Sequence, residues 1–144
     1  VTAAFFFFDQ PSDRHPDHGR SAKLVADACF YSGLIKIKTK LGRKDQQAWR
    51  PKAVYHYVQD NFIKPDLVID ITKFIDKKME CIHAYESQFY NPKSNEPATA
   101  ISGPEFLELV KAKHAIFGRY INVRYAEGFT VNRPVGVKSL LDLK

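Results

Sequence analysis

Apolar and polar residues alternate in blocks along this 144-residue chain, and the blocks predict strands interleaved with helices. Residues 1–8 form an apolar, phenylalanine-rich run bounded by polar residues and a proline, which indicates a fully buried strand. Residues 52–59 alternate in the manner of a strand with both faces partly covered, and residues 66–71 and 125–131 predict two more strands. Strands separated by helices are typical of an α/β fold.

Three stretches carry apolar residues at helical spacing. The first covers residues 19–34 and ends near Gly33, the second begins at Thr72 as its N-cap, and the third follows a capping-box pattern at Ser102 and runs to about Tyr120. The expected inward positions are Leu24, Val25, Ala28, Cys29 and either Tyr31 or Ser32 in the first, Phe74, Ile75, Met79, Ile82 and Tyr85 in the second, and Phe106, Leu109, Val110 and Phe117 in the third.

The chain is basic, with 22 Lys and Arg against 16 Asp and Glu and a net charge of +6. This balance permits a nucleic-acid partner and equally suits a small polyanionic substrate. Residues 38–50 are basic without an apolar period, which predicts a solvated loop. Cys29 and Cys81 lie among apolar neighbours and are expected to be buried free thiols in a reducing compartment. The chain shows no signal-peptide pattern and no apolar run of membrane-spanning length, so we expect a cytoplasmic protein without a membrane partner.

Residues 13–20, with the sequence DRHPDHGR, concentrate the titratable side chains between an apolar run and a helical pattern. This is where open α/β sheets place their sites. Pro16 fixes its own φ and disfavours the helical region for His15, so that histidine is expected to precede the helix. A rigid loop that presents His, Asp and His suits a metal site or an acid–base site. The alternative is a polar loop that caps the next helix, with Asp17 as the acceptor.

DRHPDHGR, followed by SAKLVADACFYSGL, resembles the second metal-site motif of the LmbE-like (PIG-L-type) zinc N-deacetylases, and among them most resembles the bacillithiol-biosynthesis deacetylases. The resemblance continues through WRPKAVYHYVQD, KPDLVIDIT, KKMECIHAYESQF and YAEGFTV, and therefore covers residues 13–140, whereas residues 1–12 match poorly. It implies an α/β fold of the Rossmann-like, three-layer αβα kind. Residues 1–144 would be a single incomplete domain, the C-terminal portion of that fold with its N-terminal strands absent.

The sequence departs from the family at its start. Such enzymes open with a strand and a His-Pro-Asp-Asp motif that supplies two zinc ligands and the general base, and no such motif occurs here. The only methionine is Met79, so Val1 does not look like a translation start. We therefore expect the C-terminal part of an enzyme, inactive on its own.

The resemblance assigns roles within the motif. His18 would be a ligand of Zn2+, and His15 would face the substrate carbonyl as electrostatic stabiliser and general acid. Asp17 would hold the His15 imidazole and fix its tautomer. Arg14 would lie near anionic or sugar-hydroxyl groups of the substrate. Arg20 is expected to pair locally on the helix, without a role in the site.

The remaining histidines, His56, His83 and His114, have no partner at ligand spacing and are expected to be structural or solvated. Tyr125 and Glu127 match a family block whose role cannot be read from chemistry. Aromatic residues such as Tyr55, Tyr57 and Phe106 are expected in the core.

The implied function is zinc-dependent hydrolytic N-deacetylation of a small N-acetylglucosaminide, with N-acetylglucosaminyl-L-malate of bacillithiol biosynthesis as the expected substrate. The complete enzyme would be a homo-oligomer. One alternative is a basic, non-enzymatic nucleic-acid-binding module, against which we count the dispersed positive charges and the lack of a binding motif. The other is an inactive remnant that folds poorly because its sheet is incomplete.

Overall fold

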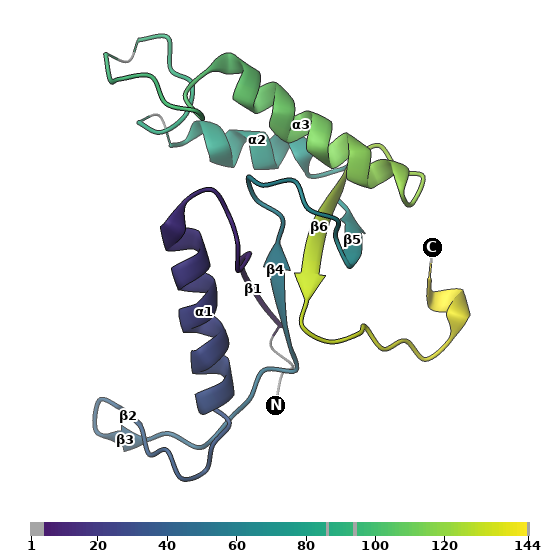
Figure 1. Ribbon diagram of the computed structural model, residues 1–144. Coiled ribbons are helices and arrows are strands. Elements are labelled where there is room, and N and C mark those ends of the chain that lie inside the picture. Colours follow the sequence, from purple (N-terminus) through teal and green to yellow (C-terminus); the bar gives the residue numbers. More distant parts are fainter. Residues whose placement is uncertain (1–4, 86, 94, 144) are drawn as a thin grey trace. The chain divides into compact units, whose positions relative to one another are not determined.

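The computed structural model describes residues 5–85, 87–93 and 95–143 (Figure 1). Strands β1 (Phe5–Asp9), β4 (Ala53–Tyr57), β6 (Ala126–Val131) and β5 (Leu67–Asp70) form one mixed sheet in that order. β1 and β4 are parallel, and β4 and β6 are antiparallel. The chain divides into two compact units: the second covers Leu67–Gly128, and the first comprises the residues before and after it.

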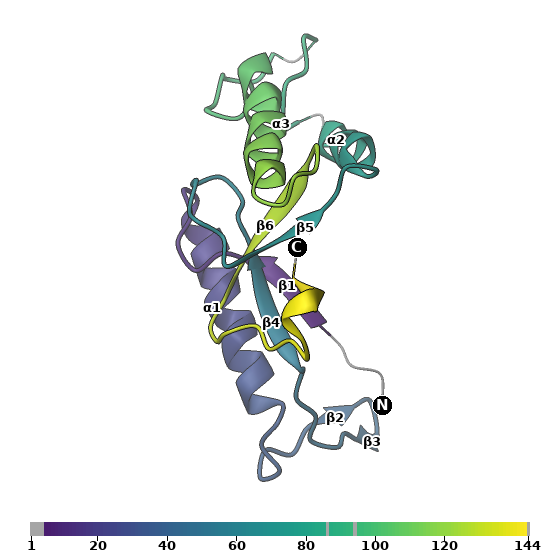
Figure 2. The same ribbon diagram turned by 90° about the vertical axis from the view of Figure 1, so that its right-hand side faces the viewer.

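In the first unit, β1 leads through a loop into helix α1 (Pro16–Tyr31), which packs against β1 and β4 (Figures 1 and 2). The DRHPDHGR motif is only partly a loop, because its last five residues form the start of α1. His15 is the N-cap in an extended conformation, and its Nδ1 accepts a hydrogen bond from the Asp17 backbone N–H. The prediction that His15 precedes the helix is confirmed, whereas the capping acceptor is His15 and not Asp17. Gly19 is needed here because a Cβ would lie only 2.8 Å from the Pro11 carbonyl oxygen.

Two expectations of burial in this unit are wrong. Phe7 is 47% exposed, because β1 pairs with β4 along one edge and has no partner along the other among the described residues; residues 1–4 of the predicted strand lie outside the described residues. On α1 the buried residue is Ala22, while Leu24 is 70% exposed and Tyr31 is also exposed. The short strands cover only a narrow face of the helix, so part of its apolar pattern faces solvent.

Residues after α1 form the solvated loop that the sequence predicts, with a short hairpin inside it. Strands β2 (Lys40–Leu41) and β3 (Lys44–Asp45) are antiparallel, and Gly42 between them has a φ of +62°. Every residue from 35 to 48 is exposed. Side chains alone could not have predicted the hairpin, because two-residue strands carry no alternation.

The second unit contains β5, helix α2 (Ile75–His83), helix α3 (Pro104–Arg119) and the first half of β6. Its buried hydrophobic side chains are Ile75, Met79, Val110, Phe117 and Ala126. Thr72 is not the N-cap of α2: that position is Phe74, and the Thr72 hydroxyl donates to the Tyr125 carbonyl oxygen instead. Expected inward residues Phe74, Tyr85 and Leu109 are exposed.

The capping box predicted for α3 is also wrong. The N-cap is Gly103, followed by Pro104 at the first helical position, and no side chain caps the helix. The Ser102 hydroxyl donates to the Thr99 carbonyl oxygen in the preceding turn, so it is not available for the helix.

The C-terminal segment ends in a short 3-10 helix, η1 (Leu140–Asp142), which Ser139 and Asp142 close with a capping box. Leu140 and Leu141 are both exposed. None of the helices in the described residues has the length and apolar character needed to cross a membrane.

Candidate active site

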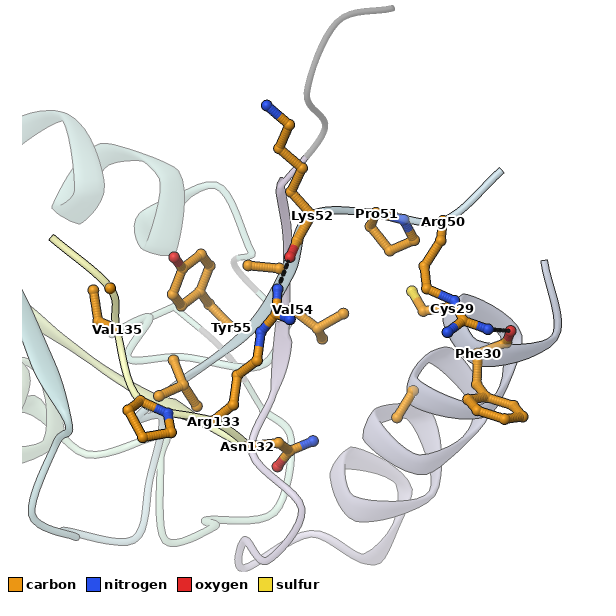
Figure 3. Close-up of a pocket in the computed structure, with 15 residues that line it drawn as sticks. Cys29, Phe30, Arg50, Pro51, Lys52, Val54, Tyr55, Asn132, Arg133 and Val135 are labelled. Carbon is orange, nitrogen blue, oxygen red and sulfur yellow. Dashed lines mark hydrogen bonds between the residues drawn. The ribbon is translucent and has the colours of Figure 1, made fainter. Parts of the chain in front are cut away.

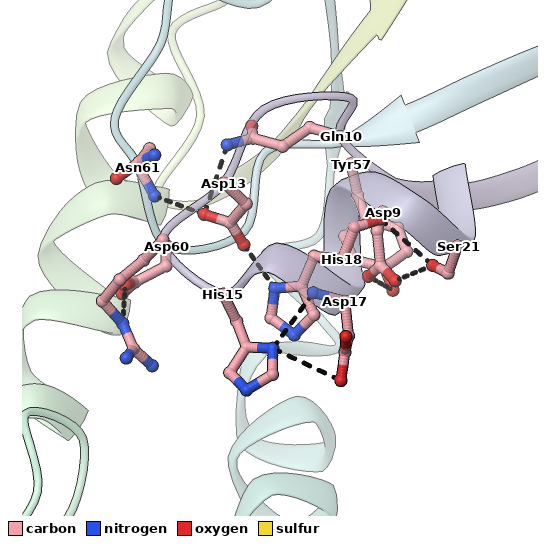
Figure 4. A network of polar contacts seen from close by, with 11 residues as sticks. Asp9, Gln10, Asp13, His15, Asp17, His18, Ser21, Tyr57, Asp60 and Asn61 are labelled. Atoms are coloured by element: carbon pink, nitrogen blue, oxygen red, sulfur yellow. Dashed lines mark hydrogen bonds and ion pairs between the residues drawn. The ribbon is translucent and has the colours of Figure 1, made fainter. Parts of the chain in front are cut away.

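The DRHPDHGR motif is held at the carboxyl ends of β1 and β4 by the loop that follows β4 (Figure 4). Arg14 Nε donates to Asp60 Oδ2 at 2.6 Å, and the Asn61 backbone N–H donates to Asp13 Oδ1 at 2.9 Å. These two links connect residues that are 46 and 48 positions apart in the sequence. They fix the motif at the edge where α/β sheets carry their sites.

His18 is anchored by the buried carboxylate of Asp13, a residue for which the sequence alone suggested no role. Its Nδ1 lies 2.6 Å from Asp13 Oδ2, and the Asp13 side chain is fully buried. Burial alone would raise the pKa of Asp13, but hydrogen bonds from the Asn61 backbone and from His18 outweigh it and lower the pKa below its usual value. An ionised carboxylate only accepts, so Nδ1 of His18 carries a proton, and in the neutral ring Nε2 presents its lone pair. The His18 side chain is 28% exposed, which leaves the ring accessible.

His15 has the opposite arrangement of its ring nitrogens. Its Nδ1 accepts from the Asp17 backbone N–H at 3.2 Å, so the neutral ring carries its proton on Nε2. Half of the side chain is exposed, and the ring centroid lies 5.4 Å from that of His18. The motif thus brings together one imidazole with a free lone pair and one with a free N–H.

The structure places Asp17 beside His15 without a hydrogen bond between their side chains. The closest approach, Asp17 Oδ2 to His15 Nδ1, is 3.9 Å. Asp17 Oδ1 instead accepts from Arg20 Nη1 at 3.1 Å, which confirms the local pairing expected of Arg20. Arg14 is partly exposed and bound to Asp60, so its predicted contact with substrate, like the role of Asp17, stays a prediction.

A second carboxylate, Asp9, ties α1 to the strands. Asp9 is the last residue of β1 and accepts from the Ser21 hydroxyl at 2.6 Å and the Tyr57 hydroxyl at 2.5 Å (Figure 4). Ser21 lies one helical turn after His18 and also contacts the His18 carbonyl oxygen at 3.2 Å. The sequence alone suggested a role for neither aspartate. Their places in the sequence could have indicated one, because Asp9 ends an apolar strand and Asp13 is the first residue of the motif.

The other histidines are structural or solvated, as predicted. His56 and His114 are buried, and Nδ1 of each bonds a backbone carbonyl oxygen, that of Asp9 and of Ala126 respectively. Burial, and then the charge of Lys78, lowers the pKa of His114 to about 4. His83 is exposed.

The structure also shows the surroundings of Glu127 and of the two cysteines. Glu127 forms an ion pair with Lys78, both in the second unit, so this residue of the YAEGF block has a structural partner. Both cysteines are free, but only Cys29 is partly buried, and this burial raises the pKa of its thiol. Cys81 is exposed, so the prediction of burial is wrong there: α2 turns that side toward solvent.

The side chains present fit one ligand of a zinc site and not a complete centre. Among the described residues, no group of three or more His, Cys, Asp or Glu side chains could hold a metal ion. Among the described histidines that donate through Nδ1, only His18 is partly exposed, so its other ring nitrogen could reach a metal ion. Any further ligands would have to come from outside the described residues.

No protein-family profile matches the chain, but solved structures do. The conserved protein TT1542 from Thermus thermophilus matches with a TM-score of 0.74 and 28% identity over 92% of this chain and 53% of that one. N,N'-diacetylchitobiose deacetylase from Pyrococcus horikoshii, complexed with its inhibitor MPG, matches with a TM-score of 0.66 and 23% identity, over 97% and 50% of the two chains. GalB, the 4-carboxy-2-hydroxymuconate hydratase from Pseudomonas putida KT2440, matches with a TM-score of 0.63 and 21% identity, over 94% and 55%.

These similarities confirm the α/β fold: the mixed four-strand sheet matches about half of the diacetylchitobiose deacetylase structure. The chain spans about half the length of each of the three proteins. One of the three is named as a hydratase, so the fold alone does not select the reaction.

Proposed function

We propose that this chain supplies the histidine motif of a zinc-dependent N-deacetylase that hydrolyses a small N-acetylglucosaminide, with N-acetylglucosaminyl-L-malate as the substrate. The observation that carries this proposal is the Asp13–His18 pair, which joins the loop after β1 to the first turn of α1. Support comes from the fold, which is similar to that of a diacetylchitobiose deacetylase. The remaining metal ligands and the general base would come from sequence outside this chain.

His18 would hold the metal through Nε2, with Asp13 fixing its tautomer and ring orientation. A bound zinc ion would supply a strong nucleophile at neutral pH, since zinc lowers the pKa of a water molecule that it binds to about 7. The Asp9–Ser21 hydrogen bond would keep the first turns of α1, and with them His18, in place against the strands.

His15 would act on the substrate carbonyl through its Nε2–H, donating a hydrogen bond to the oxygen as negative charge develops there. Protonation of the leaving amine requires the doubly protonated ring, in which Nδ1 no longer accepts from the Asp17 backbone. The Asp17 carboxylate, 3.9 Å away, is then the natural partner of Nδ1–H. Asp17 would thus favour the charged form of His15 after a small rearrangement.

Arg14 would meet the anionic part of the substrate. Its guanidinium is partly exposed and keeps N–H groups beyond the one bonded to Asp60. Arginine binds carboxylates in two-pronged geometry, and a malate group offers two of them. Substrates without that group would therefore bind more weakly.

The test is a chimera that joins this chain to the half of the Thermus protein that it does not match. We expect the zinc-loaded chimera to release acetate from N-acetylglucosaminyl-L-malate, and the 144-residue chain alone to give only background. Turnover by the isolated chain would contradict the need for further ligands. A folded, zinc-binding chimera without deacetylation would contradict the proposed reaction.

Two substitutions in the chimera separate the roles within the motif. His15→Ala should keep zinc and lower turnover by roughly a hundredfold to ten-thousandfold, the range for a lost general acid or oxyanion donor. Asp17→Asn should keep zinc and move one limb of the pH–rate profile. Zinc loss in His15→Ala, measured by atomic spectroscopy, would overturn this division of roles.

A further inference from the structure

The net positive charge of this chain arises in one segment, although its Lys and Arg side chains are spread over the whole sequence. The second unit has eight Lys and Arg and eight Asp and Glu, so the whole excess of +6 belongs to the first. Within the first unit, residues 36–52 carry seven Lys and Arg and a single acidic residue, Asp45. That segment alone therefore accounts for the net charge.

The segment ends in a pocket of about 340 Å³ in the first unit (Figure 3). Its walls come from the last turns of α1, the residues that enter β4 and the residues that follow β6. Its charged lining residues are Arg50, Lys52 and Arg133, and no Asp or Glu lines it. The rest of the lining is largely apolar and includes Ala26, Val54, Tyr55, Val131 and Val135.

Arg50 is held in place by three separate features. Its Nη2 donates to the Phe30 carbonyl oxygen at 2.9 Å, and its guanidinium carbon lies 4.9 Å from the centroid of the Phe30 ring. Gly33 provides the space, because a Cβ there would lie 2.4 Å from Arg50 Nε. Most of the ordering cost for this side chain is therefore met before any ligand arrives.

Arg133 is held in a similar way, since its Nη2 donates to the Lys52 carbonyl oxygen (Figure 3). Each guanidinium thus donates one N–H group to a backbone carbonyl oxygen and has further N–H groups with which to bind a ligand. Neither has a carboxylate partner among the described residues. Two fixed guanidinium groups over apolar walls match a ligand with a compact negative charge and an apolar body.

We propose that this pocket binds a small organic dianion of the phosphate-monoester type, with an aromatic or aliphatic group in contact with the apolar lining. The basic segment would raise the local concentration of such anions. Cys29, in the pocket, follows His18 by eleven residues on α1, which corresponds to roughly 16 Å along the helix axis. The pocket is therefore separate from the DRHPDHGR motif, and the proposal does not depend on deacetylation.

Cys29 provides a direct readout, because it lines the pocket and Cys81 is the only other cysteine. In the full chain carrying Cys81→Ser, we would measure the rate of Cys29 modification by a neutral maleimide against the concentration of phenyl phosphate. Phenyl phosphate should slow the reaction saturably, and the neutral analogue phenol should not. Equal slowing by phenol, or none by millimolar phenyl phosphate, would overturn the proposal.

Substitutions test which side chains bind the anion. Arg50→Gln and Arg133→Gln should each weaken protection of Cys29 by about tenfold or more, as expected for a lost charge-assisted hydrogen bond. Gly33→Ala should weaken it as well, because the new Cβ displaces Arg50. Arg119→Gln, at an exposed arginine of the second unit, is the matched control and should change nothing. Circular dichroism identifies any variant that fails to fold, and an equal effect of Arg119→Gln would contradict the assignment.

Discussion

The two units of this chain each fix a histidine through its Nδ1, and the contrast between them separates a ligand candidate from a structural residue. His18, in the first unit, donates to the buried Asp13 carboxylate and remains 28% exposed. His114, in the second, bonds the Ala126 carbonyl oxygen and is only 1% exposed. Both kinds of partner occur in metal-bound histidines, so the exposure of the His18 ring, and not its hydrogen bond alone, makes it the ligand candidate. A hydrogen bond at Nδ1 therefore accompanies a ligand candidate at His18 and a packed side chain at His114; His56, in the first unit, resembles His114 in its burial and its carbonyl partner.

The environments of the two rings reinforce this contrast. His114 has Lys78 and Lys113 as cationic neighbours and Glu127 as an acidic one, and the net result with burial is a pKa of about 4. The ring is then neutral at physiological pH, with a buried Nε2 for which the described residues offer no hydrogen-bond partner. His18 faces a carboxylate in a unit that carries the entire net charge of the chain. The net charge of the chain and the two imidazoles of the DRHPDHGR motif therefore lie in the same unit.

The largest expected effect is a difference in zinc binding and turnover between His18→Ala and His114→Asn in the chimera. His18→Ala removes the proposed ligand, so zinc should be lost and turnover should fall by roughly a thousandfold or more. Stability should fall as well, because the buried Asp13 carboxylate loses a hydrogen-bond partner. His114→Asn keeps a donor for the Ala126 carbonyl oxygen but leaves a small cavity, so the free energy of unfolding should fall by about 1–3 kcal/mol. Its turnover per folded molecule should be unchanged. Zinc analysis, acetate release and urea unfolding of both variants provide the check; zinc loss in His114→Asn would break the contrast.

This contrast also shows which parts of the fold and of the candidate site the sequence could predict. The order of strands and helices followed from apolar periodicity, and the DRHPDHGR motif stood out by the residues that it concentrates. Asp13 could not be recognised as the anchor of His18, because its burial depends on Asn61 and Gln10, and Asn61 lies 48 residues away in the sequence. Tertiary hydrogen bonds of this kind leave no periodic signal.

The helix ends were predicted least well, for a related reason. Thr72 and Ser102 have the residue types of N-caps, yet both hydroxyls are engaged by carbonyl oxygens, one of them 53 residues away. The apolar face of α1 was misplaced because the short strands beneath it bury only one small residue, Ala22. Local propensity describes what a side chain can do, and the surrounding fold decides which option is used.

The next largest effect is a dependence of stability on pH, which arises from His114 in the second unit. The pKa of His114 is about 4 in the folded chain and near 6.5 when unfolded, so between these values the unfolded state binds more protons. The stability that depends on a neutral His114 is complete above about pH 6.5 and is lost as pH falls toward 4, by up to about 3 kcal/mol. Urea unfolding of the full chain between about pH 4.5 and 7 should show this slope. His114→Asn should flatten it, and an unchanged slope would mean that other groups cause it.

The smallest effect tests the anchor of His18 itself. In Asp13→Asn the amide can still accept from the Asn61 backbone, but its NH₂ group would then face His18 Nδ1 and favour the tautomer with the proton on Nε2. That tautomer has no lone pair for a metal at Nε2. Zinc affinity of the chimera should fall by about tenfold to a hundredfold, the usual cost of losing such a partner.

The tautomer can be followed without metal or activity, in the isolated chain, from the ¹⁵N chemical shifts of the His18 ring. The native chain should show the proton on Nδ1 and Asp13→Asn should show it on Nε2. Asp27→Asn is the matched control, since Asp27 is an exposed aspartate on α1 that pairs only with Lys23 among the described residues. It should leave both the tautomer and the zinc affinity unchanged. If Asp13→Asn leaves the His18 tautomer as it is, Asp13 is a structural residue like the partner of His114, and the distinction between the two units would lose its chemical basis.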